Sequence, residues 1–136
     1  MLIVEPVQNK QDQEKFCADC GVGFEPDALC YAAFVDGKLV GICQFRLMAG
    51  GAHIIDLCRA NGTDDLDALF IMGRQTMNFI DLHGVHECFF DESAVAELSR
   101  DFAEKLGFTA KNGGLYCDLA GFFDSPCAHG KAGSPR

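Results

Sequence analysis

Apolar residues change their spacing along the chain, and the changes mark the elements that the sequence predicts. Residues 52–58 (AHIIDLC) form a short apolar run between glycine-containing turns, as expected for a buried strand. Residues 66–80 repeat apolar side chains at the spacing of a helix with one buried face. Residues 85–90 (VHECFF) are again short and apolar. Strand, helix and strand in this order predict a βαβ unit with two parallel strands and a right-handed crossover.

Polar residues and glycine define the ends of this helix. Thr63 is expected to cap it, and Gly84 is expected to end it. Three aspartates fill its first turn, where carboxylates are favoured: Asp64, Asp65 and Asp67. Ligands of βαβ units bind at the carboxyl end of the first strand, beside the helix N-terminus. The segment from Leu57 to Asp65 is therefore the expected functional end of the molecule.

The N-terminal part predicts one helix and three further strand segments. Residues 2–4 are strand-like, and Asn9 can cap a helix that runs to about Cys20. Asp36-Gly37 separates two β-rich runs and predicts a hairpin, because both residues tolerate positive φ. A turn over residues 48–51 then returns the chain into the strand at 52–58, so these strands form an antiparallel meander.

The C-terminal part predicts a second crossing helix and a last strand. The helix is expected from Asp91 to Gly107, and the strand, as a hairpin, over residues 108–119. The order β-α-β-β-β-α-β-α-β predicts an α/β fold, with a mixed sheet, one central parallel pair and helices on both faces. We expect a single domain over residues 1–124 and a flexible Gly/Pro/Ser-rich tail over residues 125–136.

Composition narrows the class of protein. The 136 residues suffice for one domain with a core. A net charge of −9 disfavours binding to nucleic acid or to an anionic membrane. The sequence has no apolar run of membrane-spanning length, and its N-terminus lacks the features of a signal peptide. A cytoplasmic location is expected.

The sequence holds eight cysteines, most of them inside predicted apolar strands. This placement favours reduced thiols packed in the core, with no structural metal. The alternative is a zinc site built from the close pair Cys17 and Cys20, with Cys127 and His129 in the tail.

Two local motifs add a resemblance to a family. Residues 104–108 (EKLGF) follow the last predicted helix, and residues 59–62 (RANG) follow the strand at 52–58. In this element order they resemble the GNAT acyltransferase superfamily over residues 2–119. The resemblance implies transfer of an acetyl group from acetyl-CoA to a small-molecule amine. It places pantetheine on the edge of the first parallel strand and pyrophosphate at the helix N-terminus. The implied cofactor-binding residues are Leu57, Cys58, Arg59, Gly62 and Thr63.

The sequence departs from the family at two places. Asp64 stands where the loop usually has glycine or alanine, and with Asp65 and Asp67 it would repel a pyrophosphate, so weak or absent coenzyme A binding is expected. Ala103 occupies the position of the family's usual tyrosine general acid. A second hypothesis is therefore a GNAT-like protein that has lost coenzyme A binding and serves as a ligand-binding or interaction module.

Asp56 is the candidate catalytic residue. It lies within an apolar strand, where burial would raise the pKa of a carboxyl that faces the cleft and suit it to act as general base. The alternative is a strand carboxylate bonded to a neighbour. Strict alternation along the strand predicts that His53 faces the opposite side from Asp56. The identity of the amine and the oligomeric state, including a homodimer, remain open.

Overall fold

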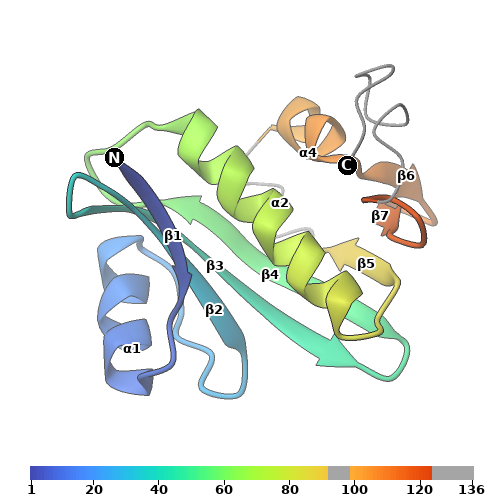
Figure 1. Cartoon of the computed structure of the whole chain (residues 1–136), viewed down its shortest axis with the longest axis horizontal. Coiled ribbons are helices and arrows are strands. Elements are labelled where there is room, and N and C mark those ends of the chain that lie inside the picture. The colour runs from blue at the N-terminus through green and yellow to red at the C-terminus, as the bar shows by residue number, and fades with distance from the viewer. Residues whose placement is uncertain (92–98, 124–136) are drawn as a thin grey trace.

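A mixed seven-stranded sheet forms the centre of the computed structural model, which describes residues 1–91 and 99–123. The spatial order is β1-β2-β3-β4-β5-β7-β6 (Figure 1). Neighbouring strands are antiparallel except for β4 and β5, which are parallel, as the sequence predicted. The strands are β1 Leu2–Pro6, β2 Leu29–Val35, β3 Lys38–Met48, β4 Gly51–Arg59, β5 Glu87–Phe90, β6 Thr109–Lys111 and β7 Gly114–Asp118.

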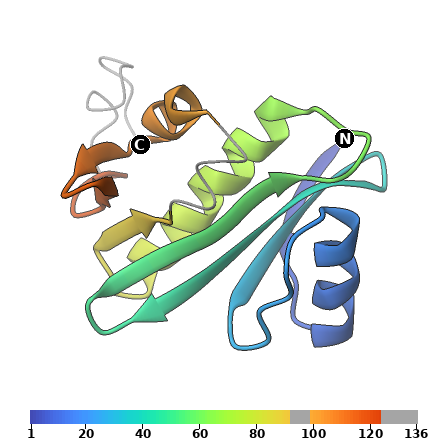
Figure 2. The same ribbon diagram turned by 180° about the vertical axis from the view of Figure 1, so that it is seen from behind.

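Three helices with described bounds cover the two faces of the sheet: α1 Lys10–Asp19, α2 Leu66–Leu82 and α4 Arg100–Leu106. On one face α2 and α4 pack over the main core, which includes Leu57, Leu69 and Leu106. On the other face α1 covers a smaller core that includes Cys17, Ile42 and Cys58, and Figure 2 shows α1 in front of the strands. The fold class and the two covered faces are those predicted from the sequence.

The local turn chemistry explains why the chain reverses where it does. Asp36 and Gly37 have φ of 51° and 82°, and Asn112 and Gly113 have φ of 52° and 82°. Positive φ at both central residues matches the twist of the flanking strands, so each pair makes a tight hairpin. Asn9 caps α1 by accepting a hydrogen bond of 3.0 Å from the backbone N–H of Asp12.

The predicted cap of the long helix was wrong. Asp65, not Thr63, is the N-cap of α2, and its side chain accepts from the backbone N–H of Ala68. The Thr63 hydroxyl instead lies 2.7 Å from the carbonyl oxygen of Ala60 and 3.1 Å from that of Val40. Thr63 is therefore held by the loop and by β3, which moves the helix start two residues further on.

The boundaries after α2 also differ from the prediction. Gly84 follows the end of α2 with φ of 81°, as expected, but β5 begins at Glu87 rather than at residue 85. Ser99 caps α4 and accepts from the backbone N–H of Phe102. Residues 92–98 of the predicted helix and the tail predicted at 125–136 lie outside the described residues.

A β-bulge in β4 overturns the predicted orientation of His53. Phe45 of β3 pairs with Ile54 and Gln44 pairs with Asp56, so Ile55 is an extra residue in β4. The bulge shifts the alternation by one residue. Ile54 and Leu57 consequently both face the α2 core. His53 and Asp56, which flank them, therefore lie on the same face of the sheet, the face of α1.

The described cysteines are core residues, as predicted. All seven of them, including Cys43 and Cys58, are buried free thiols. Burial raises the pKa of Cys43 to about 12, so the thiol stays protonated at neutral pH. Within residues 1–91 and 99–123, no three His, Cys, Asp or Glu side chains gather to hold a metal ion. Cys127 and His129 lie outside these ranges.

Candidate functional site

The edge of β4 is the first component of the site. β5 pairs with β4 only from Ala52 to Ile54, and the backbone N–H of Asp91 then donates to the carbonyl oxygen of Ile54 at 3.0 Å. Among the described residues, those of β4 after Ile54 have a strand neighbour only in β3. The two strands thus part here, and the backbone of β4 is presented toward the gap.

The side chains of Leu57 and Cys58 point away from this edge. Leu57 is buried in the α2 core, and Cys58 is buried beneath α1. A ligand at the edge would meet their backbone groups and not their side chains. The GNAT resemblance implies the same arrangement, in which pantetheine pairs with the edge of a strand as another strand would.

The loop after β4 is a tight turn. The backbone N–H of Thr63 donates to the carbonyl oxygen of Ala60 at 3.0 Å, and Gly62 has φ of 82°. The Thr63 hydroxyl is already engaged by backbone oxygens, so it is not available as a donor to a phosphate. Gly62 and Arg59 are the exposed members of the predicted cofactor-binding set.

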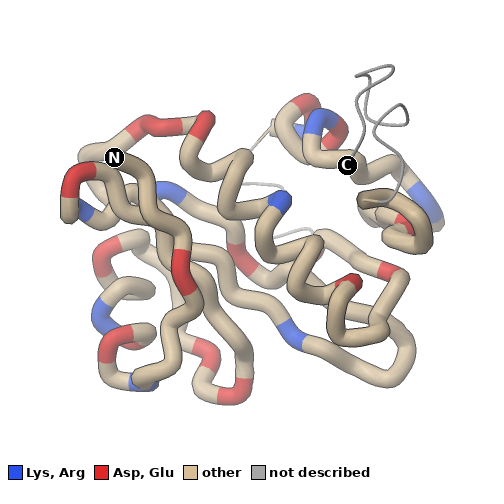
Figure 3. The backbone as a smooth tube through the Cα atoms, in the orientation of Figure 1, with Lys and Arg blue, Asp and Glu red and all other residues tan. Residues whose placement is uncertain are grey.

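The N-terminus of α2 is occupied by carboxylates from the chain itself. Asp65 Oδ1 accepts from the backbone N–H of Ala68 at 3.0 Å. Arg59 Nη1 donates to Asp64 Oδ1 at 3.1 Å, in an ion pair whose side chains are largely exposed. A hollow of about 520 Å³ lies here and is lined by Asp64, Asp65, Leu66 and Asp67. Figure 3 shows this acidic run in the loop that leads into α2.

The two halves of the implied coenzyme A site therefore fit differently. The parted edge of β4 fits a strand-like pantetheine arm, because the backbone beyond Ile54 faces the gap. The start of α2 does not fit a pyrophosphate as it stands, because Asp65 uses a helix N–H and Asp64 uses the cation of Arg59.

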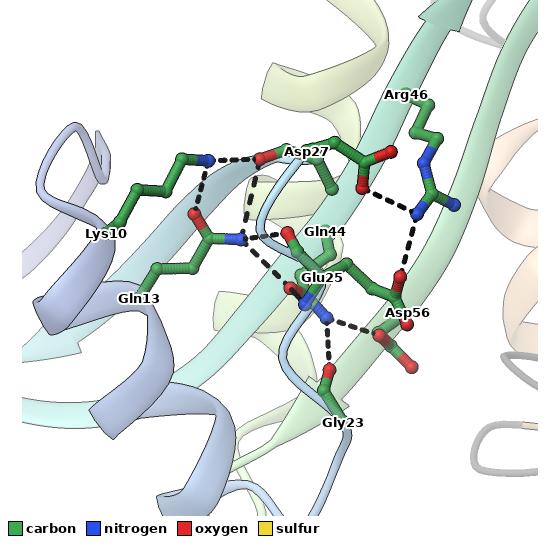
Figure 4. Close-up of polar contacts among 9 residues, drawn as sticks. Lys10, Gln13, Gly23, Glu25, Asp27, Gln44, Arg46 and Asp56 are labelled. Atoms are coloured by element: carbon green, nitrogen blue, oxygen red, sulfur yellow. Dashed lines mark hydrogen bonds and ion pairs between the residues drawn. The ribbon is translucent and has the colours of Figure 1, made fainter.

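Asp56 lies just beyond the point where the strands part and is held by a buried glutamine. Gln44 Nε2 donates to Asp56 Oδ2 at 2.7 Å and to the carbonyl oxygen of Gly23 at 2.9 Å (Figure 4). Gln44 Oε1 accepts from Gln13 Nε2 at 2.9 Å and from the backbone N–H of Glu25 at 3.1 Å. Gln13 and Gln44 are each fully buried. The carboxylate of Asp56 is thus bonded to a neighbour and fixed in place.

The same network fastens the segment between α1 and β2 to the sheet. Arg46 of β3 donates to Glu25 Oε1 at 2.7 Å and to Asp27 Oδ1 at 2.9 Å (Figure 4). The hydrogen bond from Arg46 lowers the pKa of Asp27. Lys10 Nζ donates to the carbonyl oxygen of Ala28 at 2.6 Å, which ties the start of α1 to the end of the segment.

A second hollow lies at the end of β5, where the strands part. It measures about 410 Å³ and is lined by residues of β4, β5 and the β6–β7 hairpin, among them His53, Phe89, Asp91, Lys111 and Asn112. His53 Nδ1 lies 3.3 Å from Asp91 Oδ1. His53 and Asp56 therefore offer an imidazole and a carboxylate on one face of β4, on either side of the bulge.

The sequence reasoning missed two parts of this site. The role of Gln44 could have been predicted, because it is a polar residue inside an otherwise apolar strand run. The pairing of His53 with Asp91 could not have been predicted from the residue pattern, since it depends on the bulge at Ile55 and on the register of β4 and β5.

The position implied for a tyrosine general acid is part of the core. Ala103 is 1% exposed and packs with Phe102 on the α2 side of the sheet. No proton donor is therefore supplied from this position.

None of the described helices is both long and apolar enough to cross a lipid bilayer.

Comparison with known proteins identifies the fold. No protein-family model matches the sequence, and no curated protein sequence matches it. Solved structures do match. The IAA acetyltransferase of Bacillus cereus superposes with a TM-score of 0.67 at 14% identity, over 88% of this chain and 100% of that chain. The PaiA N-acetyltransferase of Thermoplasma acidophilum, solved with coenzyme A, gives 0.64 at 12% identity, over 87% and 99%.

A third similar structure is named for the acetylation of a protein. The ribosomal-protein-S18-alanine N-acetyltransferase of Escherichia coli gives a TM-score of 0.63 at 9% identity, over 88% of this chain and 94% of that chain. Other matches are described as GNAT-family acetyltransferases. The chain therefore has the GNAT acyl-CoA N-acyltransferase fold, as a divergent example, and at these identities it is the fold that the likeness establishes.

Proposed function

We propose that this chain is an N-acetyltransferase that transfers an acetyl group from acetyl-CoA to a small amine. The observation that carries the proposal is the parting of β4 and β5 directly after Ile54, with Asp56 and His53 on one face beside the gap. The likeness to acetyltransferases solved with coenzyme A or acetyl-CoA supports the same reading.

Bound acetyl-CoA would supply an acetyl group already activated as a thioester. The backbone N–H groups of β4 after Ile54 would orient that thioester and donate hydrogen bonds to its carbonyl oxygen. The segment from Leu57 to Arg59 would supply this edge. Asp56, His53 and Asp91 are described side chains at the gap that can accept a proton from the amine.

The charge around the gap favours a basic acceptor. The chain carries a net charge of −9, and Asp56 and Asp91 lie beside the point where the strands part, while the cation of Arg46 is shared by Glu25 and Asp27. Negative potential at a cleft raises the local concentration of cations. A primary amine, which is an ammonium ion in neutral solution, is attracted by this surface and must lose a proton before it can react.

The acidic start of α2 sets the expected affinity for the cofactor. The pyrophosphate would have to bind beside Asp64 and Asp65 or displace them. The enzyme is therefore proposed to hold coenzyme A mainly through the edge of β4, and weakly.

Titration of the ¹⁵N-labelled protein with acetyl-CoA, followed by NMR, tests the binding mode. The expected result is a saturable shift of the amide signals from Ile55 to Arg59, larger than the shifts at the start of α2. Signals of α1, such as that of Lys15, serve as the internal control. Binding that leaves the amides of β4 unchanged, or no binding at millimolar acetyl-CoA, would contradict the proposal and favour a GNAT-like module without coenzyme A.

A further inference from the structure

A histidine and an aspartate bridge β4 and β5 at the point where the strands part. His53 belongs to β4, and Asp91 directly follows the last residue of β5. His53 Nδ1 lies 3.3 Å from Asp91 Oδ1. The backbone N–H of Asp91 donates to the carbonyl oxygen of Ile54, the residue after His53, at 3.0 Å. The aspartate is therefore anchored to the strand that carries the histidine.

The ring of His53 is held in one orientation and keeps one nitrogen accessible. It stacks on Phe89 with a centroid distance of 5.1 Å and an interplanar angle of 24°. An ionised carboxylate only accepts hydrogen bonds, so Asp91 favours a proton on Nδ1 of His53 and leaves a lone pair on Nε2. The side chains of His53 and Asp91 are 38% and 40% exposed, so a ligand in the hollow at the end of β5 can reach the ring.

The two nearby cationic side chains, Arg46 and Lys111, do not compete with His53 for the carboxylate of Asp91. Arg46 lies opposite His53 in the β3–β4 ladder, but its guanidinium donates to Glu25 and Asp27. Lys111, which also lines the hollow, has its ammonium 4.0 Å from the centre of the Tyr116 ring. Asp91, directly after β5, is thus the acidic partner of His53.

We propose that His53 accepts the proton of the amine during acetyl transfer, with Asp91 as its positioning residue. The inference rests on the proposed function and names a proton acceptor for it. The ammonium form first releases one proton to water, and the neutral amine then reacts. Its nitrogen forms a bond to the thioester carbonyl carbon, and the carbon–sulfur bond breaks with its electron pair on sulfur, so coenzyme A leaves as the thiolate. The surplus proton of the nitrogen goes to Nε2 of His53, and the resulting imidazolium is stabilised by the carboxylate of Asp91.

Asp56 is the less suitable acceptor on geometric grounds. Its carboxylate receives a hydrogen bond of 2.7 Å from Gln44, whose amide is fully buried and bonded on both sides. A proton on Asp56 would weaken the hydrogen bond that its carboxylate receives from Gln44, whereas His53 meets Asp91 through Nδ1 and its ring lines the hollow. Asp56 instead contributes fixed negative charge, which attracts the ammonium form of the acceptor.

The test compares five variants of the whole chain: His53→Gln, His53→Gly for rescue by free imidazole, Asp91→Asn, Asp56→Asn and, as control, His86→Gln. His86 also pairs with an aspartate, Asp81, at 2.6 Å, but before β5 begins, at the end of that strand away from the hollow. The assay measures acetylated product by mass spectrometry with acetyl-CoA and four primary-amine probes: spermidine, tyramine, L-lysine and a peptide with a free N-terminus. Acetyl-CoA affinity and melting temperature are measured for each variant.

We expect His53→Gln to lower kcat by about 100-fold or more, with acetyl-CoA affinity and melting temperature unchanged. Asp91→Asn should lower kcat by about tenfold, and free imidazole should restore part of the activity of His53→Gly. The control His86→Gln should stay within about twofold of the unmodified protein. Turnover that survives His53→Gln but is lost in Asp56→Asn would overturn the assignment and leave the proposed function standing. No product from the unmodified protein with any amine would overturn both.

A second measurement needs no substrate. NMR of ¹⁵N-labelled imidazole rings should show the Nδ1–H tautomer for His53 in the free protein, and Asp91→Asn should shift this signal and leave that of His86 in place. An Nε2–H tautomer for His53 would overturn the proposal, because the proposed acceptor nitrogen would then carry a proton already.

Discussion

Removing two negative charges at the start of α2 should strengthen coenzyme A binding. The perturbation is the double change Asp64→Asn with Asp65→Asn. Asn is as good an N-cap as Asp, so the hydrogen bond to the backbone N–H of Ala68 is kept and α2 should remain intact. Arg59, now paired with Asp64, becomes free to meet a phosphate.

The size of the effect follows from charge separation. Two unit charges roughly 7 Å apart in water interact by about 0.6 kcal/mol. Two carboxylates facing the two charges of a pyrophosphate give four such repulsions, about 2.4 kcal/mol before screening. Salt at about 0.1 M screens exposed charges over roughly 10 Å, which leaves on the order of 1.2 kcal/mol. The dissociation constant should therefore fall by about sevenfold.

The assay is calorimetric titration with coenzyme A at low salt and again at about 1 M salt, where the screening length is about 3 Å and the gain should largely vanish. The matched control is Asp12→Asn with Glu14→Gln, which removes the same charge from the exposed face of α1. Micromolar binding by the unmodified protein, unchanged in the double variant, would refute the reasoning. The aspartates would then have to point away from the bound pyrophosphate.

Three further predictions concern the scaffold. Gln44→Leu should lower the free energy of unfolding by roughly 3 kcal/mol in urea, because it strips partners from a buried network, whereas the exposed Gln75→Leu should be nearly neutral. Gly41→Ala should also destabilise, since the added Cβ would lie 2.7 Å from the backbone carbonyl oxygen of Cys58, and its urea midpoint should fall well below that of the unmodified chain. Burial raises the pKa of Cys17 and Cys43 from 9.0 to about 12, so the folded state keeps protons that the unfolded chain loses. Stability under reducing conditions should fall between pH 9 and pH 12, by about 1.4 kcal/mol per pH unit for each thiol, and an unchanged urea midpoint at pH 10 would contradict this.

The elements of the fold were predictable because their signals are local. Asn9 before an amphipathic run and Asp36-Gly37 between two β-rich runs each act through their own backbone geometry. The helix-length segment between β4 and β5 required a crossover, so the parallel pair followed from chain length.

The site was less predictable because its details depend on tertiary contacts. Thr63 and Asp65 are both good N-cap residues. Asp65 caps α2 because the Thr63 hydroxyl is instead engaged by the carbonyl oxygens of Val40 and Ala60. A bulge at Ile55 leaves no mark in the residue pattern, yet it moves His53 to the face of Asp56. The acidic loop, in contrast, was read correctly as carrying its own carboxylates at the helix start.

Turnover with acetyl-CoA shows directly whether the parted strands form an acetyltransferase site. The purified chain is incubated with isotopically labelled acetyl-CoA and the four amines, and both acetylated amine and released coenzyme A are quantified by chromatography and mass spectrometry. Thiol reagents are avoided because the chain contributes eight cysteines. We expect equal amounts of labelled N-acetyl product and free coenzyme A, with both lost in His53→Gln. Absence of labelled product from every amine, together with intact acetyl-CoA, would contradict this expectation.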